Sequence, residues 1–386
     1  SEMCIRDSLQ ADGSNVLIGY VDTGIDYLND VFKDELGRTR IQAIWDQTDK
    51  TGEDGVNMYA HFGRVYEKDD IDRAIEADNN GGNPYSYVAQ RDTIGHGTLL
   101  ASISAGSYVN GYVGVAPKSE LLVVKLKESK QYLKDFFLIK DDVPAFEEGD
   151  IMLAMRFLAD YAVRLGKPLI IIFGLGSANG SRTGAAPLAE MMESLTKRPN
   201  ISVVTCMGNE ANNKCHYKGT VTSALVPDVM EVNVDGTGKG FTMEIWAESL
   251  DILSVSIESP SGEFVPRIPA RMGASMEYTF LYEGSTVTVD YQITENVAGM
   301  EVIFIRLSTP VEGTWKFYIY SLTNIRGSYN AWLPLKQFSG QDIYFLKSDP
   351  DTTLTVPAAA DGVISVGAYN PVSYTHLRAH ETLRHL

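Results

Sequence analysis

The sequence predicts an α/β fold, a parallel sheet between two layers of helices, together with an all-β region of jelly-roll or sandwich type. Three observations predict it. Apolar runs of strand length alternate with amphipathic helical patterns over residues 16–206. Short alternating runs separated by turn residues replace them between about 230 and 345. The first pattern then resumes over residues 353–369.

The composition is that of a folded, acidic protein. Of the 386 residues 44% are hydrophobic, and the formal net charge is −17, so the chain is long enough for a sizeable core and two domains. An acidic surface argues against nucleic acid or an anionic membrane as the partner. No run of 18 apolar residues occurs, so we expect no membrane span. The three cysteines are too few for a disulfide framework. Cys206 and Cys215 could pair, but unpaired small core or loop residues explain them better.

The first predicted strand covers residues 16–21 and ends at Asp22-Thr23-Gly24. Open α/β sheets place their sites at the carboxyl ends of strands, so Asp22 is a candidate site residue. An Asp followed closely by Gly is also a common turn. This stretch alone leaves both readings open.

The second candidate is His96, which lies between Gly95 and Gly97. The apolar positions that follow have helical spacing, so His96 is expected at a helix N-terminus facing a cleft. A lone histidine is more often a buried residue with satisfied ring nitrogens. Asp22 favours the functional reading, because a carboxylate that binds one ring nitrogen fixes the tautomer and leaves the other nitrogen free to take a proton.

The remaining elements of the α/β region follow from local patterns. Continuous apolar runs predict strands that are buried on both faces, and apolar positions spaced by three and four predict helices. A mixed aromatic and acidic insertion covers 127–149. The expected strands are 37–46, 120–126, 169–173 and 201–206, and the expected helices are 69–77, 150–165 and 185–197.

An acidic cluster at the start of the first of these helices could bind calcium. It comprises Asp69, Asp70 and Asp72, and its spacing fits no EF-hand loop. A solvated charged helix face explains the cluster better. We therefore expect no cofactor from this cluster.

The all-β region contains six alternating runs with turn residues between them. The turns are marked by Ser259-Pro-Ser-Gly262 and Pro310-Val-Glu-Gly313. Runs of this length and spacing are typical of a β-sandwich or jelly roll. The six are 243–247, 252–257, 278–282, 286–292, 301–307 and 314–320.

The two candidate stretches together resemble the subtilisin-like serine peptidases. Residues 21–26 read V-D-T-G-I-D and residues 95–98 read G-H-G-T, and residues 201–210 resemble the strand of that family that ends in G-N-E. The resemblance implies a subtilisin-like fold in which Asp22 orients His96, the general base. It also implies that Asn209 donates a hydrogen bond to the oxyanion.

A further segment, Gly174-Leu175-Gly176, matches the family's substrate-pairing edge, which usually reads Ser-Leu-Gly. The change to Gly174 leaves the role intact, because pairing with an extended substrate uses the backbone. A phosphate-binding glycine loop is the competing reading. No G-x-G-x-x-G and no suitably placed Lys support it.

Within the family the chain resembles the Csp-type subtilases of clostridia and related anaerobes. A β region followed by V-G-A-Y-N at 366–370 carries this resemblance, with Trp332-Leu-Pro334 and Val124-Lys-Leu-Lys127. It implies that the β region is inserted in the catalytic domain. It also implies a protein or peptide substrate, as in the activation of a spore cortex-lytic enzyme, and a secreted, cell-envelope or spore-associated location. Many subtilases use calcium, but no specific motif supports it here.

The family's nucleophile motif, Gly-Thr-Ser-x-Ala-x-Pro, is not found in the sequence, and neither is G-x-S-x-G. The two ends, residues 1–8 and 371–386, resemble translated adapter DNA. We therefore expect a truncated fragment whose natural chain continues past Asn370, and we do not assign Ser373. The alternative is an inactive subtilase-like protein that binds or regulates a partner.

The tail also places His376 and His380 four residues apart. This spacing raises a metal site as an alternative, but the glutamate of H-E-x-x-H is lacking. We expect no metal there. The expected divisions of the whole chain are a non-native leader at 1–11, a first catalytic part at 12–229, an inserted β-sandwich at 230–345, a resumed catalytic part at 346–370 and a non-native tail at 371–386.

Overall fold

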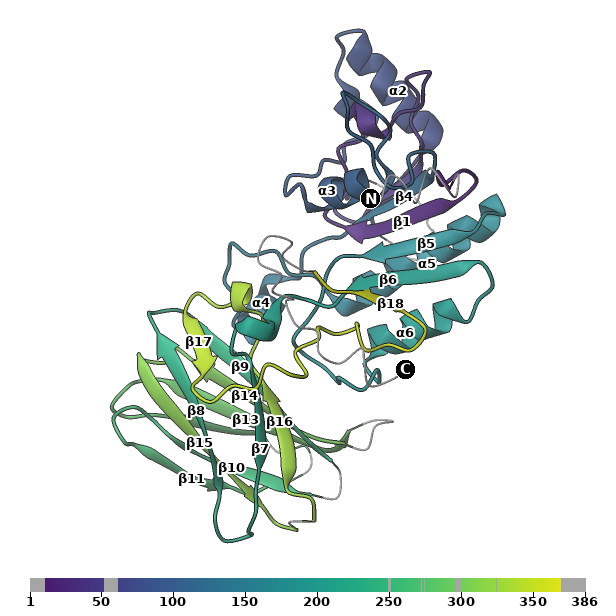
Figure 1. Cartoon of the computed structure of the whole chain (residues 1–386). Coiled ribbons are helices and arrows are strands. Elements are labelled where there is room, and N and C mark those ends of the chain that lie inside the picture. Colours follow the sequence, from purple (N-terminus) through teal and green to yellow (C-terminus); the bar gives the residue numbers. More distant parts are fainter. Residues whose placement is uncertain are drawn as a thin grey trace.

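The computed structural model describes residues 11–51, 62–248, 251–271, 273, 275–295, 300–323 and 325–368. These residues form two lobes, an α/β unit and a β-sandwich, which lie end to end (Figure 1). The chain enters the sandwich from the α/β unit and returns to it, as the yellow C-terminal part of the ribbon shows.

The α/β unit is built on a seven-stranded sheet of described residues. Neighbouring strands are parallel except for β3, which runs antiparallel to β2 at one edge. The predicted parallel sheet is therefore confirmed. In sheet order its strands are β18 (Ile364–Val366), β6 (Ile201–Cys206), β5 (Leu169–Phe173), β1 (Leu17–Asp22), β4 (Glu120–Lys125), β2 (Ile41–Asp46) and β3 (Arg64–Glu67).

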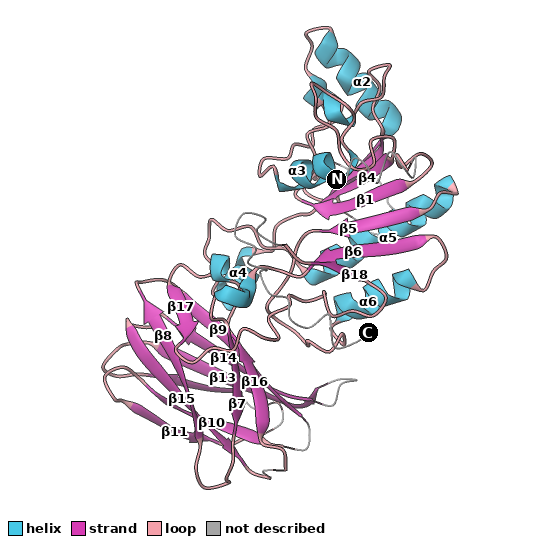
Figure 2. Cartoon of the chain, viewed as in Figure 1, coloured by secondary structure: helices cyan, strands magenta, loops and turns pink. Residues whose placement is uncertain are grey.

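Helices cover both faces of this sheet, which gives the three predicted layers (Figure 2). Helices α5 and α6 form one apolar core with β1, β4 and β5. Helices α2 and α3 form another core on the opposite face. The helices are α2 (Lys68–Asn79), α3 (His96–Ala105), α4 (Gln131–Phe136), α5 (Glu148–Leu165) and α6 (Pro187–Thr196), with 3₁₀ turns η1 (Asp30–Phe32), η2 (Pro84–Ser86), η3 (Glu210–Asn212) and η4 (Lys336–Phe338).

Local sequence explains how the longest helix ends. Helix α5 stops at Gly166, which adopts φ 65° and caps the helix with hydrogen bonds to Ala162 and Val163. A left-handed conformation at this position suits glycine, which has no Cβ to clash. The residue before Pro168 is then directed into the following strand.

The segment expected to be a mixed insertion, 127–149, contains helix α4, which the sequence analysis did not predict. This helix lies between the two lobes (Figure 1). Its Phe136 ring stacks on Phe304 of the sandwich at a centroid distance of 5.9 Å, and Phe137 meets the same ring edge-on. A six-residue helix is marginal by itself, so packing against the sandwich explains why it forms.

The second lobe consists of two antiparallel sheets whose inner faces share one apolar core. Trp315, Phe280 and Tyr291 are among its fully buried side chains. Alternation of apolar and polar residues along each strand supplies this inner face. In sheet order the strands are β11 (Phe264–Ile268), β10 (Leu253–Glu258), β15 (Gly313–Ser321), β8 (Asp228–Asp235) and β17 (Asp342–Phe345), and then β12 (Ser275–Thr279), β13 (Thr286–Glu295), β14 (Met300–Ser308), β9 (Gly240–Glu248), β16 (Ser328–Trp332) and β7 (His216–Thr220).

The six predicted runs fall on strands β9, β10, β12, β13, β14 and β15, with one shift. The run expected at 278–282 is a strand only to Thr279, because Phe280 starts a turn in which its N–H donates to the carbonyl of Ser285 at 2.8 Å. Strands β7, β8, β11, β16 and β17 were not predicted. They are short or mixed in polarity, and all of them except β11 pair with strands from distant parts of the chain.

The strands suggest a different start for the inserted unit from the one expected at residue 230. Strand β7 begins at His216 and β8 at Asp228, and both belong to the sandwich sheets, whose last strand ends at Phe345. We therefore propose 216–345 as the inserted unit. Beyond it, β18 pairs in parallel with β6. The expected leader falls, except for Ala11, outside the described residues, and the expected tail lies wholly outside them.

Candidate active site

The candidate residues are positioned by the carboxyl ends of three neighbouring strands, β1, β5 and β6. Asp22 is the last residue of β1, Gly174 follows β5 directly, and Asn209 lies three residues beyond β6. Because these strands are parallel neighbours, their carboxyl ends meet at one edge of the sheet. Helix α3, which packs on β1, brings His96 to the same edge.

His96 and Asp22 are in direct contact. The Nδ1 atom of His96 lies 2.8 Å from Oδ1 and 2.9 Å from Oδ2 of Asp22. The Asp22 carboxylate is fully buried, and the backbone N–H of Thr23 also donates to it at 2.7 Å. The His96 side chain is 45% exposed, and its Nε2 has no hydrogen-bond partner among the described residues. The pair therefore offers an open, basic nitrogen to solvent or to a substrate.

The environment of His96 favours the protonated ring. The hydrogen bond to Asp22 raises the pKa of His96 above its ordinary value, and the charges of Asp22 and Asp92 add to this effect, while partial burial opposes it. A raised pKa means that the imidazolium formed by proton uptake is stabilised. This is the electrostatic behaviour that a general base needs.

Glycines allow the close approach of the segments around this pair. A Cβ added at Gly97 would lie 2.2 Å from the carbonyl oxygen of Gly24, so only glycine fits where α3 meets the end of β1. A Cβ added at Gly174 would lie 3.3 Å from Cε1 of His96. The structure thus places the proposed substrate edge directly beside the histidine ring.

Asp92 organises the start of helix α3, and the sequence analysis did not single it out. Its carboxylate accepts hydrogen bonds from the N–H of Gly95 at 2.8 Å and from both the N–H and the hydroxyl of Thr98 at 2.9 and 2.6 Å. The hydroxyl of Thr23, the residue after Asp22, also donates to it at 2.9 Å. Asp92 therefore links the strand that carries Asp22 to the helix that carries His96. The sequence signal that could have identified this role is an Asp three residues before the N-cap glycine, because such a side chain can accept hydrogen bonds from the first turn of the helix.

These donors also set the charge state of Asp92. Partial burial by itself opposes ionisation, but hydrogen bonds from Thr98, Gly95 and Thr23 lower the pKa of the Asp92 carboxyl below its ordinary value. The group is consequently a stable anion near His96. Its charge is one of the causes that raise the pKa of the histidine.

Thr355 joins the two other candidate segments and was also missed. Its N–H donates to the carbonyl of Met207 at 3.0 Å, just before the Gly208-Asn209 pair. Cβ atoms added at Gly176 or Gly208 would each lie 2.5 Å from the Thr355 side chain. One residue therefore packs on both segments. Nothing local in the sequence marks it, because the contact joins residues almost 150 positions apart.

Asn209 occupies the N-cap position of η3, but its side chain makes no capping hydrogen bond there. It is half-buried. The amide is thus not used to hold the turn that follows it. The structure places Asn209 at the same sheet edge as Asp22.

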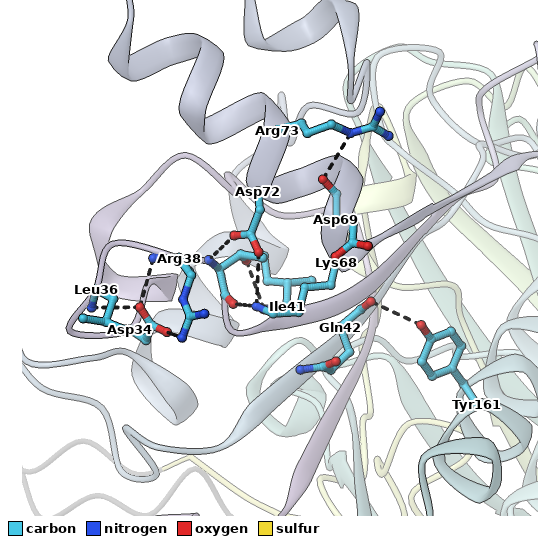
Figure 3. Close-up of polar contacts among 11 residues, drawn as sticks. Asp34, Leu36, Arg38, Ile41, Gln42, Lys68, Asp69, Asp72, Arg73 and Tyr161 are labelled. Atoms are coloured by element: carbon cyan, nitrogen blue, oxygen red, sulfur yellow. Dashed lines mark hydrogen bonds and ion pairs between the residues drawn. The ribbon is translucent and has the colours of Figure 1, made fainter.

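The acidic cluster of α2 is engaged in local contacts (Figure 3). Asp70 completes a capping box with Glu67 at the start of the helix. Asp72 accepts from the N–H of Thr39 at 2.7 Å and pairs with Lys68 at 3.6 Å. Among the described residues no group of three or more His, Cys, Asp or Glu side chains is arranged to hold a metal ion. His376 and His380 lie outside the described residues.

The two described cysteines, Cys206 and Cys215, are free thiols. Burial raises the pKa of the Cys215 thiol to about 12 and also raises that of Cys206. Pairing of these residues, which the sequence left open, is therefore not observed. In the described part of the chain, no helix combines the length and apolar character needed to cross a membrane.

Comparison with known proteins shows similarity to subtilisin-like proteases. The chain is similar over 97% of its length to a solved structure entitled "Structure of the Clostridium Perfringens CspB protease", with a TM-score of 0.81 and 26% identity, and the match covers 74% of that chain. It is 27% identical over 170 residues to "Subtilisin-like protease SBT3.6" of Arabidopsis thaliana and 34% identical over 109 residues to "Subtilisin-like protease SBT3.5" of the same plant. These matches span 21% and 14% of the lengths of the two plant proteins.

The subtilase family model matches residues 13–242, more than half of the chain. This range includes both of the motifs that carry Asp22 and His96, and the segments at Gly174 and Asn209. The chain belongs to the subtilase family of peptidases.

Proposed function

We propose that the protein is a serine endopeptidase that cleaves protein or peptide substrates through an Asp/His/Ser triad. The observation that carries the proposal is the hydrogen-bonded pair of His96 and Asp22. Asp22 holds the ring with its proton on Nδ1. The exposed Nε2 then takes the proton of the attacking serine hydroxyl and returns it to the leaving amine, which gives an acyl-enzyme. A water molecule that gives its proton to the same nitrogen then attacks the acyl carbonyl, and the serine oxygen leaves with that proton as the acid product is released.

The neighbouring segments have supporting roles in this proposal. Asn209 donates a hydrogen bond from its side-chain amide to the oxygen that becomes negative in the tetrahedral intermediate. The backbone of Gly174, Leu175 and Gly176 pairs with the extended substrate as an added strand. Support for both roles comes from their place at the sheet edge that carries Asp22.

The nucleophile is not assigned within the 386 residues, because no Gly-Thr-Ser-x-Ala-x-Pro sequence occurs in them. We propose that it lies on a segment outside the printed sequence. A long read of the source DNA across codons 360–390 and beyond tests this directly. A Gly-Thr-Ser motif after Asn370 would support the triad. A genuine stop codon after Leu386 would instead favour an inactive family member that binds a partner.

The chemistry is tested with a chain that contains that serine. A fluorophosphonate probe, which labels activated serines, should label it, and mass spectrometry of a digested protein substrate should show internal cleavage. His96→Ala should lower turnover about 10²- to 10⁴-fold, the usual contribution of a general base. Asp22→Asn should also lower turnover, because the ring of His96 loses its carboxylate partner. Asp26→Asn is the matched control, since Asp26 is exposed and lies four residues along the chain.

The same assay on the 386-residue chain tests the need for the serine. Without the serine, residues 1–386 should show no peptide hydrolysis that depends on His96. Turnover by this chain that disappears in His96→Ala would contradict the proposed mechanism, because it would require another nucleophile.

A further inference from the structure

A buried carboxylate of the sandwich is hydrogen-bonded to the backbone of the α/β unit. Glu244 lies on β9 and is only 9% exposed. Its Oε2 accepts the N–H of Gly180 at 2.9 Å and the indole N–H of Trp246 at 2.9 Å. Gly180 belongs to the loop that follows β5, whereas Glu244 and Trp246 belong to the inserted unit. The hydrogen bond from Gly180 therefore crosses between the two lobes.

The burial of Glu244 makes the loss of this hydrogen bond costly. Burial raises the pKa of the Glu244 carboxyl, while the Gly180 N–H, the Trp246 indole and the charge of Arg182 oppose that rise. A carboxyl group removed from water is costly unless its oxygens keep their donors. Displacement of the loop would remove one donor from a group that water does not reach. The loop is consequently held where Gly180 faces Glu244.

Arg182 forms a second connection from the same loop. Its guanidinium donates to the carbonyls of Ser177 and Ala178 at 3.2 and 2.6 Å and lies 5.1 Å from the ring centre of Trp332 on β16. Trp332 is in turn anchored, because its indole N–H donates to the carbonyl of Thr352 at 2.9 Å. The loop is thus folded on itself and packed against a sandwich tryptophan.

The other end of the loop leads directly to the proposed substrate edge. Ser177 and Val356 exchange backbone hydrogen bonds at 3.0 and 2.9 Å. Ser177 follows Gly176, which packs against Thr355. Only residues 177–179 separate the edge at 174–176 from the Glu244 contact at Gly180. Each of these three residues makes a hydrogen bond within the α/β unit. A short, hydrogen-bonded stretch of backbone therefore connects the Glu244 contact to the proposed substrate edge.

We infer that Glu244 is a positioning residue through which the inserted sandwich fixes the loop 177–184 and, with it, the backbone edge that receives an extended peptide. The role of residues 174–176 in binding a peptide rests on the proposed function. The restraint of the loop by Glu244 does not depend on it. In this arrangement the sandwich determines how well a peptide strand can pair at 174–176.

Hydrogen exchange of the 386-residue chain tests the restraint. In Glu244→Ala, backbone amides of 177–184 should exchange about tenfold faster or more, because a hydrogen bond that holds them is lost. Glu244→Gln, which keeps one oxygen acceptor, should give a smaller increase and serves if the alanine variant does not fold. Trp246→Phe is the matched control, since it removes the other donor to the same oxygen but leaves the contact with Gly180. Amides of β13 and β14 should be unchanged in all three.

Binding of succinyl-Ala-Ala-Pro-Phe-p-nitroanilide, followed by NMR titration, tests the effect on the edge. The affinity should fall several-fold in Glu244→Ala and remain near wild type in Trp246→Phe. Equal exchange in Glu244→Ala and wild type, or equal acceleration in Trp246→Phe, would overturn the restraint. Unchanged peptide affinity in a variant with a loosened loop would overturn the positioning role. No binding by the wild type would instead count against the proposed function, while the exchange result would still decide the restraint.

Discussion

Two histidines of this chain lie in opposite environments. His96, at the sheet edge, has a carboxylate partner and a half-exposed ring, and these raise its pKa. His216, at the start of the sandwich, is fully buried and stacks on Trp332 at a centroid distance of 5.0 Å. Its ring nitrogens lie 3.1 Å from the carbonyl of Asp349 and 3.0 Å from Oδ1 of Asn330, and burial lowers its pKa.

The difference shows how one residue type is given two functions. An anionic partner within hydrogen-bond distance stabilises the charged ring of His96. Burial lowers the pKa of His216 more than its hydrogen bonds to Asn330 and Asp349 raise it, so the neutral ring is favoured and packs against Trp332. The first environment suits proton transfer, and the second suits a rigid junction between the lobes. Four experiments test whether the two histidines differ in this way.

The largest expected effect is on stability. His216→Ala should lower the free energy of unfolding by about 3 kcal/mol, because it leaves a cavity beside Trp332 and removes buried hydrogen bonds. His96→Ala should change it by about 1 kcal/mol or less, since the ring is half-exposed and water can reach Asp22 after its removal. Urea denaturation of both variants measures this. Equal losses would break the comparison.

The second prediction concerns pH. In NMR titration, His96 should titrate above the ordinary histidine value of 6.5 and His216 below it. The stabilising contribution of His96 is therefore present below pH 6.5 and is lost as the pH rises through its folded pKa. The contribution of His216 is present above pH 6.5 and is lost as the pH falls through its folded pKa. The reverse order of the two titrations would contradict both environments.

The third prediction concerns the carboxylate that supports His96 without touching it. Asp92→Asn should lower the pKa of His96 and reduce stability by about 1–2 kcal/mol, because charged hydrogen bonds to Thr23 and Thr98 are weakened. Asp26→Asn removes the same charge from the neighbouring loop and should leave stability nearly unchanged. If both variants behave alike, Asp92 has no specific role.

The smallest effect is expected from Trp332→Phe. The phenyl ring can still stack on His216, but the indole hydrogen bond to the carbonyl of Thr352 is lost, which should cost about 1 kcal/mol. The titration of His216 should remain below 6.5 in this variant. A normal histidine titration would show that burial of His216 depends on the indole itself.

The candidate site could be predicted to the extent that its residues lie in local motifs. Asp22 closes an apolar strand, and His96 opens a helix between glycines, so each position followed from a few neighbours in sequence. Asp92 lies only four residues from His96 but was not predicted as a site residue. Its role in linking strand β1 to helix α3 depends on the hydroxyl of Thr23, 69 positions away. Helix α4 was missed for a similar reason, since its stability depends on contact with the sandwich.

Hydrophobic periodicity and turn residues act over a few positions, so the sequence alone determined the order of strands and helices in the α/β unit, the presence of an all-β region and the places of Asp22 and His96. Gly174 and Asn209 were identified through the resemblance to subtilases. Only the tertiary structure decided that His216 is buried and that Glu244 holds Gly180. These contacts join residues 64 to 133 positions apart. Their strength depends on exclusion of water, which no local pattern encodes and which arises only when the two lobes pack together.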